Sequence, residues 1–308
     1  MQDNNIIMTR KLSKNFGDFT ALHPTDIHIQ KGDIYALIGK NGAGKTTMLK
    51  MFTGQLRPDS GDIFLFGYSA ERELLNERQK IGAIIETPGF FPNFTAKQNL
   101  EYYRIQRGIP DRLCVQRALE EVNLTDTGKK KFADFSLGMK QRLGLALALM
   151  THPALLILDE PTNGLDPEGI VEIRSLLRRL NQEKNITVLI SSHILTEVHT
   201  IANRFAFIDH GKIIEELTKE ELEKKSSKYL MVKVDNVENA SVILERNCKD
   251  VDYTILPDNN IRINGYLEES DRINKILADH GVRVFSIYQK GENLEEYFLK
   301  LIGGGLHA

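Results

Sequence analysis

The stretch Gly39-Lys-Asn-Gly-Ala-Gly-Lys-Thr46 decides the fold of this chain. It fits the pattern G-x-x-x-x-G-K-[ST], and it lies between an apolar run at 33–38 and a helical pattern at 45–53. Glycines let backbone N–H groups turn toward a phosphate, and the N-terminus of the following helix adds positive potential. The sequence therefore predicts a loop that binds a nucleoside triphosphate, and not a glycine-rich turn with an incidental lysine.

Two side chains of this loop are expected to act on the nucleotide. Lys45 is placed to neutralise the β- and γ-phosphates, and the hydroxyl of Thr46 is placed to bind Mg²⁺. The residues of the loop and of the first helical turn that we expect to contact the nucleotide are Gly39, Lys40, Asn41, Gly42, Ala43, Gly44, Lys45, Thr46 and Thr47.

A second apolar run, residues 155–158, ends in Asp159 and Glu160. The carboxylates at the end of such a buried strand are expected to emerge beside the phosphate-binding loop. There Asp159 would hold Mg²⁺ through water, and Glu160 would orient and deprotonate the attacking water. Buried strands that end in acidic residues are common, so the pairing with the upstream loop is what favours the catalytic interpretation.

Short apolar strands alternate with helical patterns over residues 1 to about 216, which predicts an α/β core with a mostly parallel sheet covered on both faces. The predicted strands are 33–38, 81–85, 155–158, 186–191 and 205–208. The predicted helices are 45–53, 95–107, 112–122, 137–150 and 168–181.

The pattern changes near residue 218. Thr218-Lys-Glu-Glu221 fits a capping box, and the charged stretch after it predicts a helical linker at 218–227. Beyond it, residues 228–308 are predicted to form a ferredoxin-like α+β domain with a regulatory or dimerisation role. The order of its predicted elements is strand 229–234, helix 237–246, strand 251–256, strand 261–264, helix 268–280 and strand 282–287, with a last helix at 294–302.

Composition sets limits on the function. Lys and Arg number 40 and Asp and Glu 42 in 308 residues, so the net charge is −2, and this near balance argues against a nucleic-acid partner. Cys114 and Cys248 are far apart in sequence, which favours free thiols in the cytosol over a metal cluster. The most apolar window, 143–158, is too short to span a membrane, so a membrane role requires a partner chain.

The segment Phe135-Ser-Leu-Gly-Met-Lys-Gln-Arg-Leu143 resembles the signature of the ATP-binding-cassette (ABC) ATPases, LSGGQ followed by QR and an apolar residue. Ser136 and Gly138 match that signature, whereas Phe135, Leu137 and Met139 depart from it. A serine that caps a helix N-terminus can face a phosphate there. An ordinary N-capped core helix is the alternative interpretation of the same residues.

Three more motifs occur in the order typical of that family. Lys14-Asn-Phe-Gly17 resembles the A-loop, in which Phe16 would stack on adenine. Asn163-Gly-Leu-Asp-Pro167 resembles the D-loop, which crosses the subunit interface, and Ser191-Ser-His193 resembles the switch that contacts the γ-phosphate. The chain is therefore identified as resembling an ABC cassette over residues 5–216.

The resemblance implies a P-loop NTPase fold, with antiparallel β and helical subdomains beside the parallel core. It implies ATP and Mg²⁺ as ligands and ATP hydrolysis as the activity. Lys45, Glu160 and His193 are then the expected catalytic residues. Beyond the phosphate loop, the further residues expected at the nucleotide are Phe16, Glu86, Ser136, Leu137, Gly138, Met139 and Asp166.

One expected motif differs from the family pattern. Glu86 stands where the Q-loop usually has glutamine, and a glutamate offers a charged oxygen to Mg²⁺ but no donor. The hypothesis is that Glu86 binds the metal more tightly and couples differently to the membrane partner. The alternative is a solvated loop residue that leaves the metal to water.

The resemblance also implies partners. Two cassettes of this family dock head to tail, so this single cassette would pair with its own copy or with a similar chain, at the cytoplasmic face of the membrane, where permease subunits hold it. Phe90, Phe91 and Phe94 form either an apolar seat for a permease helix or ordinary core. The SLGMKQRL signature, Glu86 and the segment 294–302 resemble the bacitracin-resistance and lantibiotic self-immunity exporters.

Other functions stay open at this stage. They are an exporter subunit for another small drug or a lipid, a soluble ABC ATPase without a transport role, and a sensor that binds ATP without turnover. A chromosome- or repair-type ATPase is disfavoured, because the 50 residues between Glu86 and Ser136 lack the sustained heptads of an inserted coiled coil.

Overall fold

The computed structural model describes residues 4–86 and 89–303, and the chain divides into two compact units, Met1–Lys219 and Glu220–Ala308. The boundary lies two residues beyond the predicted end of the cassette at 217. The predicted linker, 218–227, contains a helix, α8 (Lys219–Lys225). Residues 304–308 at the end of the predicted C-terminal domain lie outside the described residues.

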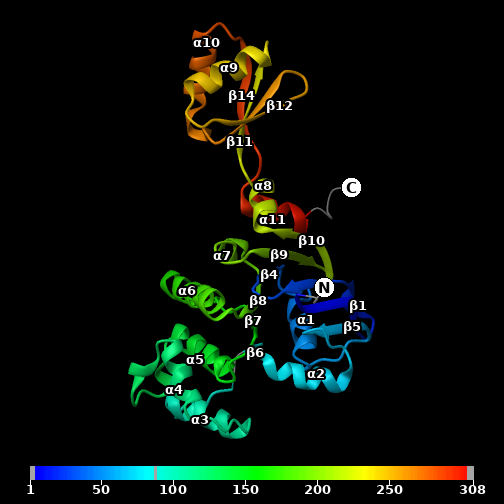
Figure 1. Cartoon of the computed structure of the whole chain (residues 1–308), viewed down its shortest axis with the longest axis vertical. Helices are drawn as coiled ribbons and strands as arrows, with labels where there is room; N and C mark the ends of the chain where they lie inside the picture. The colour runs from blue at the N-terminus through cyan, green and yellow to red at the C-terminus, as the bar shows by residue number, and fades with distance from the viewer. Residues whose placement is uncertain (1–3, 87–88, 304–308) are drawn as a thin grey trace. The chain divides into compact units, whose positions relative to one another are not determined.

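A six-stranded sheet forms the centre of the first unit (Figure 1). Its order is β10-β9-β4-β8-β7-β6, and every neighbouring pair is parallel except β10 with β9. Strands β4 and β8 are buried along their whole length, as expected of a parallel sheet with both faces covered. The strands are β4 (Ile34–Ile38), β6 (Ile81–Ile84), β7 (Leu155–Asp159), β8 (Thr187–Ser192), β9 (Arg204–Asp209) and β10 (Lys212–Thr218).

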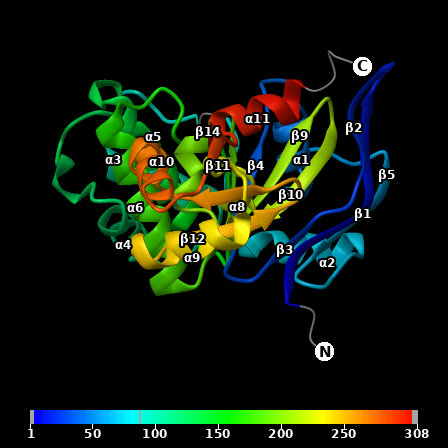
Figure 2. The same cartoon turned by 90° about the horizontal axis from the view of Figure 1, so that it is seen from above.

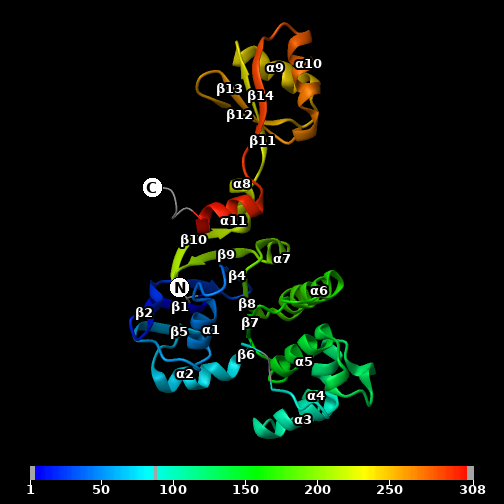
Figure 3. The ribbon, with the colours of Figure 1, turned by 180° about the vertical axis from the view of Figure 1, so that it is seen from behind.

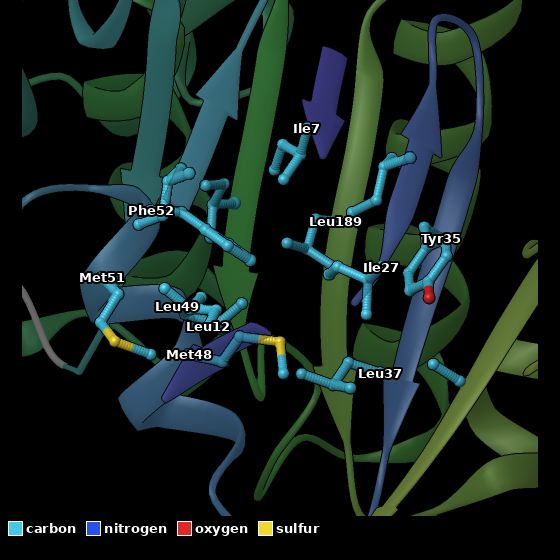
Figure 4. Close-up of a cluster of buried hydrophobic side chains, with 14 of the residues drawn as sticks. Ile7, Leu12, Ile27, Tyr35, Leu37, Met48, Leu49, Met51, Phe52 and Leu189 are labelled. Atoms are coloured by element: carbon cyan, nitrogen blue, oxygen red, sulfur yellow. The ribbon is translucent and has the colours of Figure 1, made fainter. Parts of the chain in front are cut away.

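A second, antiparallel sheet lies at one edge of this unit, opposite the helices α3 to α5 (Figure 2). It consists of β1 (Asn5–Phe16) and three strands that each pair with it: β2 (Phe19–Thr25), β3 (His28–Gln30) and β5 (Ser60–Leu65). This sheet confirms the antiparallel subdomain that the family resemblance implies. Figure 4 shows that Ile7 and Leu12 of β1 share one buried cluster with Leu37 of β4 and with Met48 and Phe52 of the helix after it.

The helices of the first unit surround the two sheets. They are α1 (Lys45–Phe52), α2 (Glu71–Glu77), α3 (Ala96–Gln106), α4 (Cys114–Glu121), α5 (Leu137–Leu149), α6 (Pro167–Lys184) and α7 (Leu195–His199). Figures 1 and 3 show α3, α4 and α5 gathered as a helical subdomain beyond β6. Helix α6 runs three residues past its predicted end. It ends at Lys184, where Asn185 adopts a left-handed conformation (φ 52°) and its N–H bonds to the carbonyl of Leu180.

After α8, the second unit has the order β-α-β-β-α-β followed by a last helix. Its antiparallel sheet is ordered β12-β13-β11-β14, the arrangement of a split βαββαβ unit. The elements are β11 (Tyr229–Val234), α9 (Val237–Asn247), β12 (Asp252–Leu256), β13 (Asn260–Asn264), α10 (Ser270–Asp279), β14 (Val284–Lys290) and α11 (Leu294–Gly303). Leu230, Val232, Ile261 and Ile263 of the sheet form a core with Leu244 and Leu277 of its helices.

Candidate active site

The phosphate-binding loop connects the end of β4 to the start of α1. Two of its glycines are required by close contacts, since a Cβ at Gly39 would lie 2.3 Å from the carbonyl oxygen of Ile208 and one at Gly44 would lie 2.6 Å from that of Ala21. Gly44 also has φ 106° and precedes the first residue of α1. The glycine spacing of the sequence motif therefore has a steric cause in the β9 and β2 backbones beside the loop.

Lys45, the first residue of α1, is buried inside this loop. Its ammonium donates to the carbonyl oxygen of Gly39 at 2.7 Å and to that of Lys40 at 3.2 Å. It also lies 3.0 Å from Oε1 of Glu160 as an ion pair, although that oxygen makes no aligned hydrogen bond. The loop thus holds a fixed positive charge at its centre, as the motif predicts.

Thr46 and Asp159 meet where α1 begins and β7 ends. The hydroxyl of Thr46 donates to Oδ2 of Asp159 at 2.7 Å, and the hydroxyl of Ser191 donates to Oδ1 at 2.5 Å. The Ser191 hydroxyl in turn accepts from the backbone N–H of Glu160 at 2.9 Å. The sequence pattern indicates Ser191 only as part of the motif that ends in His193 and predicts no role for its side chain. Its side-chain role depends on the register of β7 beside β8, which a linear pattern does not contain.

Glu160 is held between two basic side chains. Its Oε2 lies 2.7 Å from Nδ1 of His193, and its Oε1 faces Lys45. The backbone of Glu160 is left-handed, with φ 49°, a conformation that costs energy for a residue with a side chain. The turn after β7 therefore presents the carboxylate toward the loop, and His193 reaches it from the end of β8.

A pocket of about 310 Å³ opens over this loop. Its lining includes Phe16 and Phe19, whose side chains are half exposed at 51% and 62%. Phe16 was expected from the sequence, whereas Phe19 was missed because it lies across the turn between β1 and β2. Of the predicted residues, those that line the pocket are Phe16, Asn41, Gly42, Ala43, Gly44, Lys45, Thr46, Thr47 and Glu160.

Comparisons with known proteins bear directly on this site. A family model described as ABC transporter matches residues 22–163. The bacitracin transport ATP-binding protein BcrA of Bacillus licheniformis is 42% identical over 303 residues, which are 97% of this chain and 98% of that protein. This chain belongs to the ABC transporter family of ATP-binding proteins. The predicted membership and the predicted ATPase activity are thereby confirmed.

Two further matches define the similarity. The lantibiotic transport ATP-binding protein SrtF of Streptococcus pyogenes is 43% identical over 209 residues, covering 68% of this chain and 89% of that one. A bacterial ABC transporter cassette solved as a dimer, MJ0796, aligns with a TM-score of 0.61 at 26% identity, over 69% of this chain and 98% of that chain. The ABC cassette fold is therefore shared with solved relatives.

The signature residues of this ABC cassette lie at the start of α5 and do not line the pocket over the phosphate loop. Ser136 is the N-cap of α5, and its hydroxyl accepts from the backbone N–H of Met139 at 3.3 Å. Leu137 is 48% exposed, and its side chain lies against Gly164, where a Cβ would approach it to 3.1 Å. Gly138 follows within the same first turn and is half-buried. Both interpretations of Ser136 agree with this geometry.

The D-loop residue Asp166 serves as the N-cap of α6. Its Oδ1 accepts from the backbone N–H of Gly169 at 3.1 Å, and Pro167 occupies the first helical position. Like the signature, it stands apart from the phosphate-loop pocket of its own chain. Its predicted contact with nucleotide remains a prediction.

Glu86 also stands apart from that pocket. Its carboxylate is 68% exposed and lies 2.6 Å from Nζ of Lys50, which is one turn after Thr46 on α1. Its backbone is left-handed, with φ 65°. In this arrangement Lys50 is the partner of Glu86, and its metal-binding role remains a prediction.

The aromatic residues after Glu86 divide into two groups. Phe90 is buried against Tyr103 and Phe132, with ring centroids 5.8 and 5.1 Å away. Phe91 and Phe94 are each 38% exposed, and their ring centroids lie 5.0 Å apart. Phe94 lines a groove of about 440 Å³ along α3. Phe90 is thus core, whereas the other two remain at the surface.

Among the described residues, none of the helices has the length and apolarity to cross a bilayer.

Proposed function

We propose that this chain is the ATP-hydrolysing subunit of an exporter that gives resistance or immunity to a peptide antibiotic of the bacitracin type. The assignment of ATP hydrolysis rests on the carboxylate of Glu160, which is held between Lys45 and His193 at the phosphate loop. The similarity to BcrA along 97% of the chain supports the assignment of a bacitracin-type antibiotic.

In this proposal each side chain has one task. Lys45 neutralises the transferred phosphoryl group, since it is the buried cation at the centre of the loop. Glu160 accepts a proton from the attacking water, and His193 fixes its orientation through Oε2. When Lys45 turns to the phosphates, Oε1 of Glu160 loses its ion-pair partner and is left for that water. The exposed rings of Phe16 and Phe19 would stack on the adenine of the nucleotide.

The residues around Thr46 fit Mg²⁺. Thr46 and Asp159 supply hard oxygen donors within 2.7 Å of one another, and Ser191 holds the second carboxylate oxygen. No group of three His, Cys, Asp or Glu side chains suited to a metal occurs in residues 4–86 and 89–303. This agrees with an ion that shares its coordination between one carboxylate, water and the substrate's phosphates. Bound there, Mg²⁺ would neutralise charge on the phosphates.

The signature would act on a nucleotide held by a second cassette. Ser136 and Leu137 at the start of α5 are exposed and lie outside the chain's own phosphate-loop pocket, so the Ser136 hydroxyl and this helix N-terminus can face another chain. The structure of the related MJ0796 cassette was solved as a dimer, which supports this pairing. A head-to-tail pair places Ser136, Leu137, Gly138, Met139 and Asp166 at the partner's nucleotide.

The groove beside α3 would receive a helix of a permease subunit. Phe94 and Tyr102 line it, and the exposed ring of Phe91 packs on that of Tyr102 at 4.7 Å. An apolar surface of this kind marks a site of protein contact. Such a partner would hold the cassette at the cytoplasmic face of the membrane and transmit the movement of the cassette pair.

The test compares host cells that carry the intact chain with cells that carry Glu160→Gln, exposed to bacitracin and to a lantibiotic. The matched control is Glu183→Gln, an exposed position near the end of α6. Loss of bacitracin tolerance with Glu160→Gln alone supports the proposal. Loss confined to the lantibiotic reassigns the substrate to the class named for SrtF, and unchanged tolerance to both, at normal protein levels, contradicts the peptide-antibiotic assignment.

A further inference from the structure

The second unit contains a pocket of about 600 Å³ whose lining is strongly basic. Its cations come from four separate segments of the unit, and only one carboxylate, that of Glu292, lines it. The basic residues are Lys224, Lys225, Arg262, Lys290 and Lys300. The whole chain has a net charge of −2, so this concentration of positive charge does not follow from composition.

Arg262 is fixed in this pocket by three contacts. Its guanidinium lies over the ring of Tyr229 at 4.1 Å, its Nε donates to Asn264 at 2.9 Å, and Nη2 donates to the hydroxyl of Ser227 at 3.4 Å. A guanidinium held in place loses less conformational freedom when it binds an anion, and its planar fork matches phosphate geometry.

The backbone around the pocket is closely packed. Gly291 has φ 102°, and a Cβ there would lie 2.3 Å from the carbonyl oxygen of Ser227. This contact brings the turn after α8 against the turn after β14. As a result, Lys224 and Lys290 line the same pocket. The gathering of lysines therefore depends on a specific close approach between two turns.

Part of this charge is not neutralised by the unit itself. Lys300 pairs with Glu292 at 2.8 Å, whereas Lys224 and Lys290 have no ion-pair partner among residues 4–86 and 89–303. Like charges that share a pocket repel one another, and a bound anion removes that cost. The volume exceeds the need of a single inorganic phosphate and suits an anion with several charged groups.

We propose that this pocket binds a small anion that carries clustered phosphate groups, either a free polyphosphate or the phosphates of lipid headgroups. Arg262 supplies the oriented donor pair, and the lysines supply point charges around it. The site is separate from the phosphate loop, so the proposal stands whether or not the antibiotic assignment holds.

The test uses the full chain with the substitution Lys45→Ala, which weakens anion binding at the phosphate loop. Tripolyphosphate is titrated by calorimetry at low salt into this protein and into versions that also carry Arg262→Gln. The matched control adds Lys233→Gln, an exposed lysine on β11 that does not line the pocket. We expect one saturable site whose Kd rises about tenfold or more with Arg262→Gln, from the loss of a charge-assisted hydrogen bond.

A second arm identifies the source of the phosphate. The same proteins are sedimented with vesicles of phosphatidylglycerol and with vesicles of phosphatidylcholine. Tripolyphosphate binding that depends on Arg262 indicates a free ligand, and phosphatidylglycerol binding that depends on Arg262 indicates a lipid. The double variant Lys290→Gln, Lys300→Gln repeats both arms in case Arg262→Gln disturbs β13. If neither probe binds, or if no pocket substitution weakens binding relative to Lys233→Gln, the proposal is wrong.

Discussion

The phosphate-loop pocket of the cassette and the basic pocket of the C-terminal unit both offer positive charge to an anion, but they are built differently. In the first, one contiguous motif supplies the backbone, Lys45 and Thr46, and the neighbouring strand ends add Glu160 and His193. In the second, the cations come one or two at a time from four segments. A contiguous site can be found in the sequence, whereas a dispersed site becomes visible only when the fold has assembled it.

The sharpest test of this comparison is a pair of reciprocal substitutions. Lys45→Ala removes the cation at the centre of the loop, and kcat/KM for ATP should fall about a hundredfold to a thousandfold. Arg262→Gln should leave that value within about twofold, because it lies in the other unit. Steady-state phosphate release measures both, with Lys31→Ala in an exposed turn as the control for loss of a lysine. Equal losses from Lys45→Ala and Lys31→Ala would contradict the assignment.

Two helix caps, one in each unit, separate structural from catalytic roles. Ser136→Ala and Asn236→Ala each remove an N-cap hydrogen bond, so each should lower the free energy of unfolding by about 1 kcal/mol. Only Ser136→Ala should also lower ATP turnover, by about tenfold, from the loss of one hydrogen bond to a charged partner. Chemical denaturation and phosphate release measure the two effects. If turnover is unchanged, Ser136 acts as a cap alone.

The aromatic residues at the phosphate-loop pocket provide the next test. Phe16→Ala and Phe19→Ala should each raise the KM for ATP about fivefold, since stacking on a base contributes about 1 kcal/mol or more. Phe285→Ala removes an equally exposed ring from the second unit and should leave KM unchanged. A rise with Phe16→Ala alone would identify the base-stacking residue and remove Phe19 from the site.

The smallest predicted effect concerns Glu86. If its carboxylate moves between Lys50 and Mg²⁺, then Glu86→Gln should raise the Mg²⁺ concentration for half-maximal activity about threefold. Lys50→Gln removes the competing partner and should lower that concentration by a similar factor. Identical Mg²⁺ curves for the intact chain and both variants would show that Glu86 is a solvated loop residue.

Much of the fold is predictable from the sequence, because its central strands are apolar runs and the helices α3, α5 and α6 begin at side-chain caps. The short helices α2 and α7 have no side-chain cap and are absent from the predicted helices. The predicted strands of the parallel sheet end within one residue of the observed ones. The antiparallel sheet could be expected only through the family resemblance, since β1, β2 and β5 alternate burial irregularly around register shifts.

The candidate site is predictable where residues are close in sequence and less so where strands meet. Ser191 contacts Asp159 only because β8 pairs in register with β7, and Phe19 reaches the pocket only through the turn after β1. Arg262 and Lys290 meet in the basic pocket because β13 and β14 both pair with β11. No local pattern marks these three-dimensional contacts.

The central claim is that Glu160, held by Lys45 and His193, is the general base of ATP hydrolysis. The most direct measurement is the rate of phosphate release at saturating Mg²⁺-ATP for the intact chain, Glu160→Gln and the control Glu183→Gln, with ATP binding and molecular mass by light scattering followed in parallel. We predict that Glu160→Gln keeps ATP bound, slows turnover about a hundredfold or more, and accumulates as an ATP-bound dimer. Turnover within about twofold of the intact chain, with ATP bound equally well, would contradict the account.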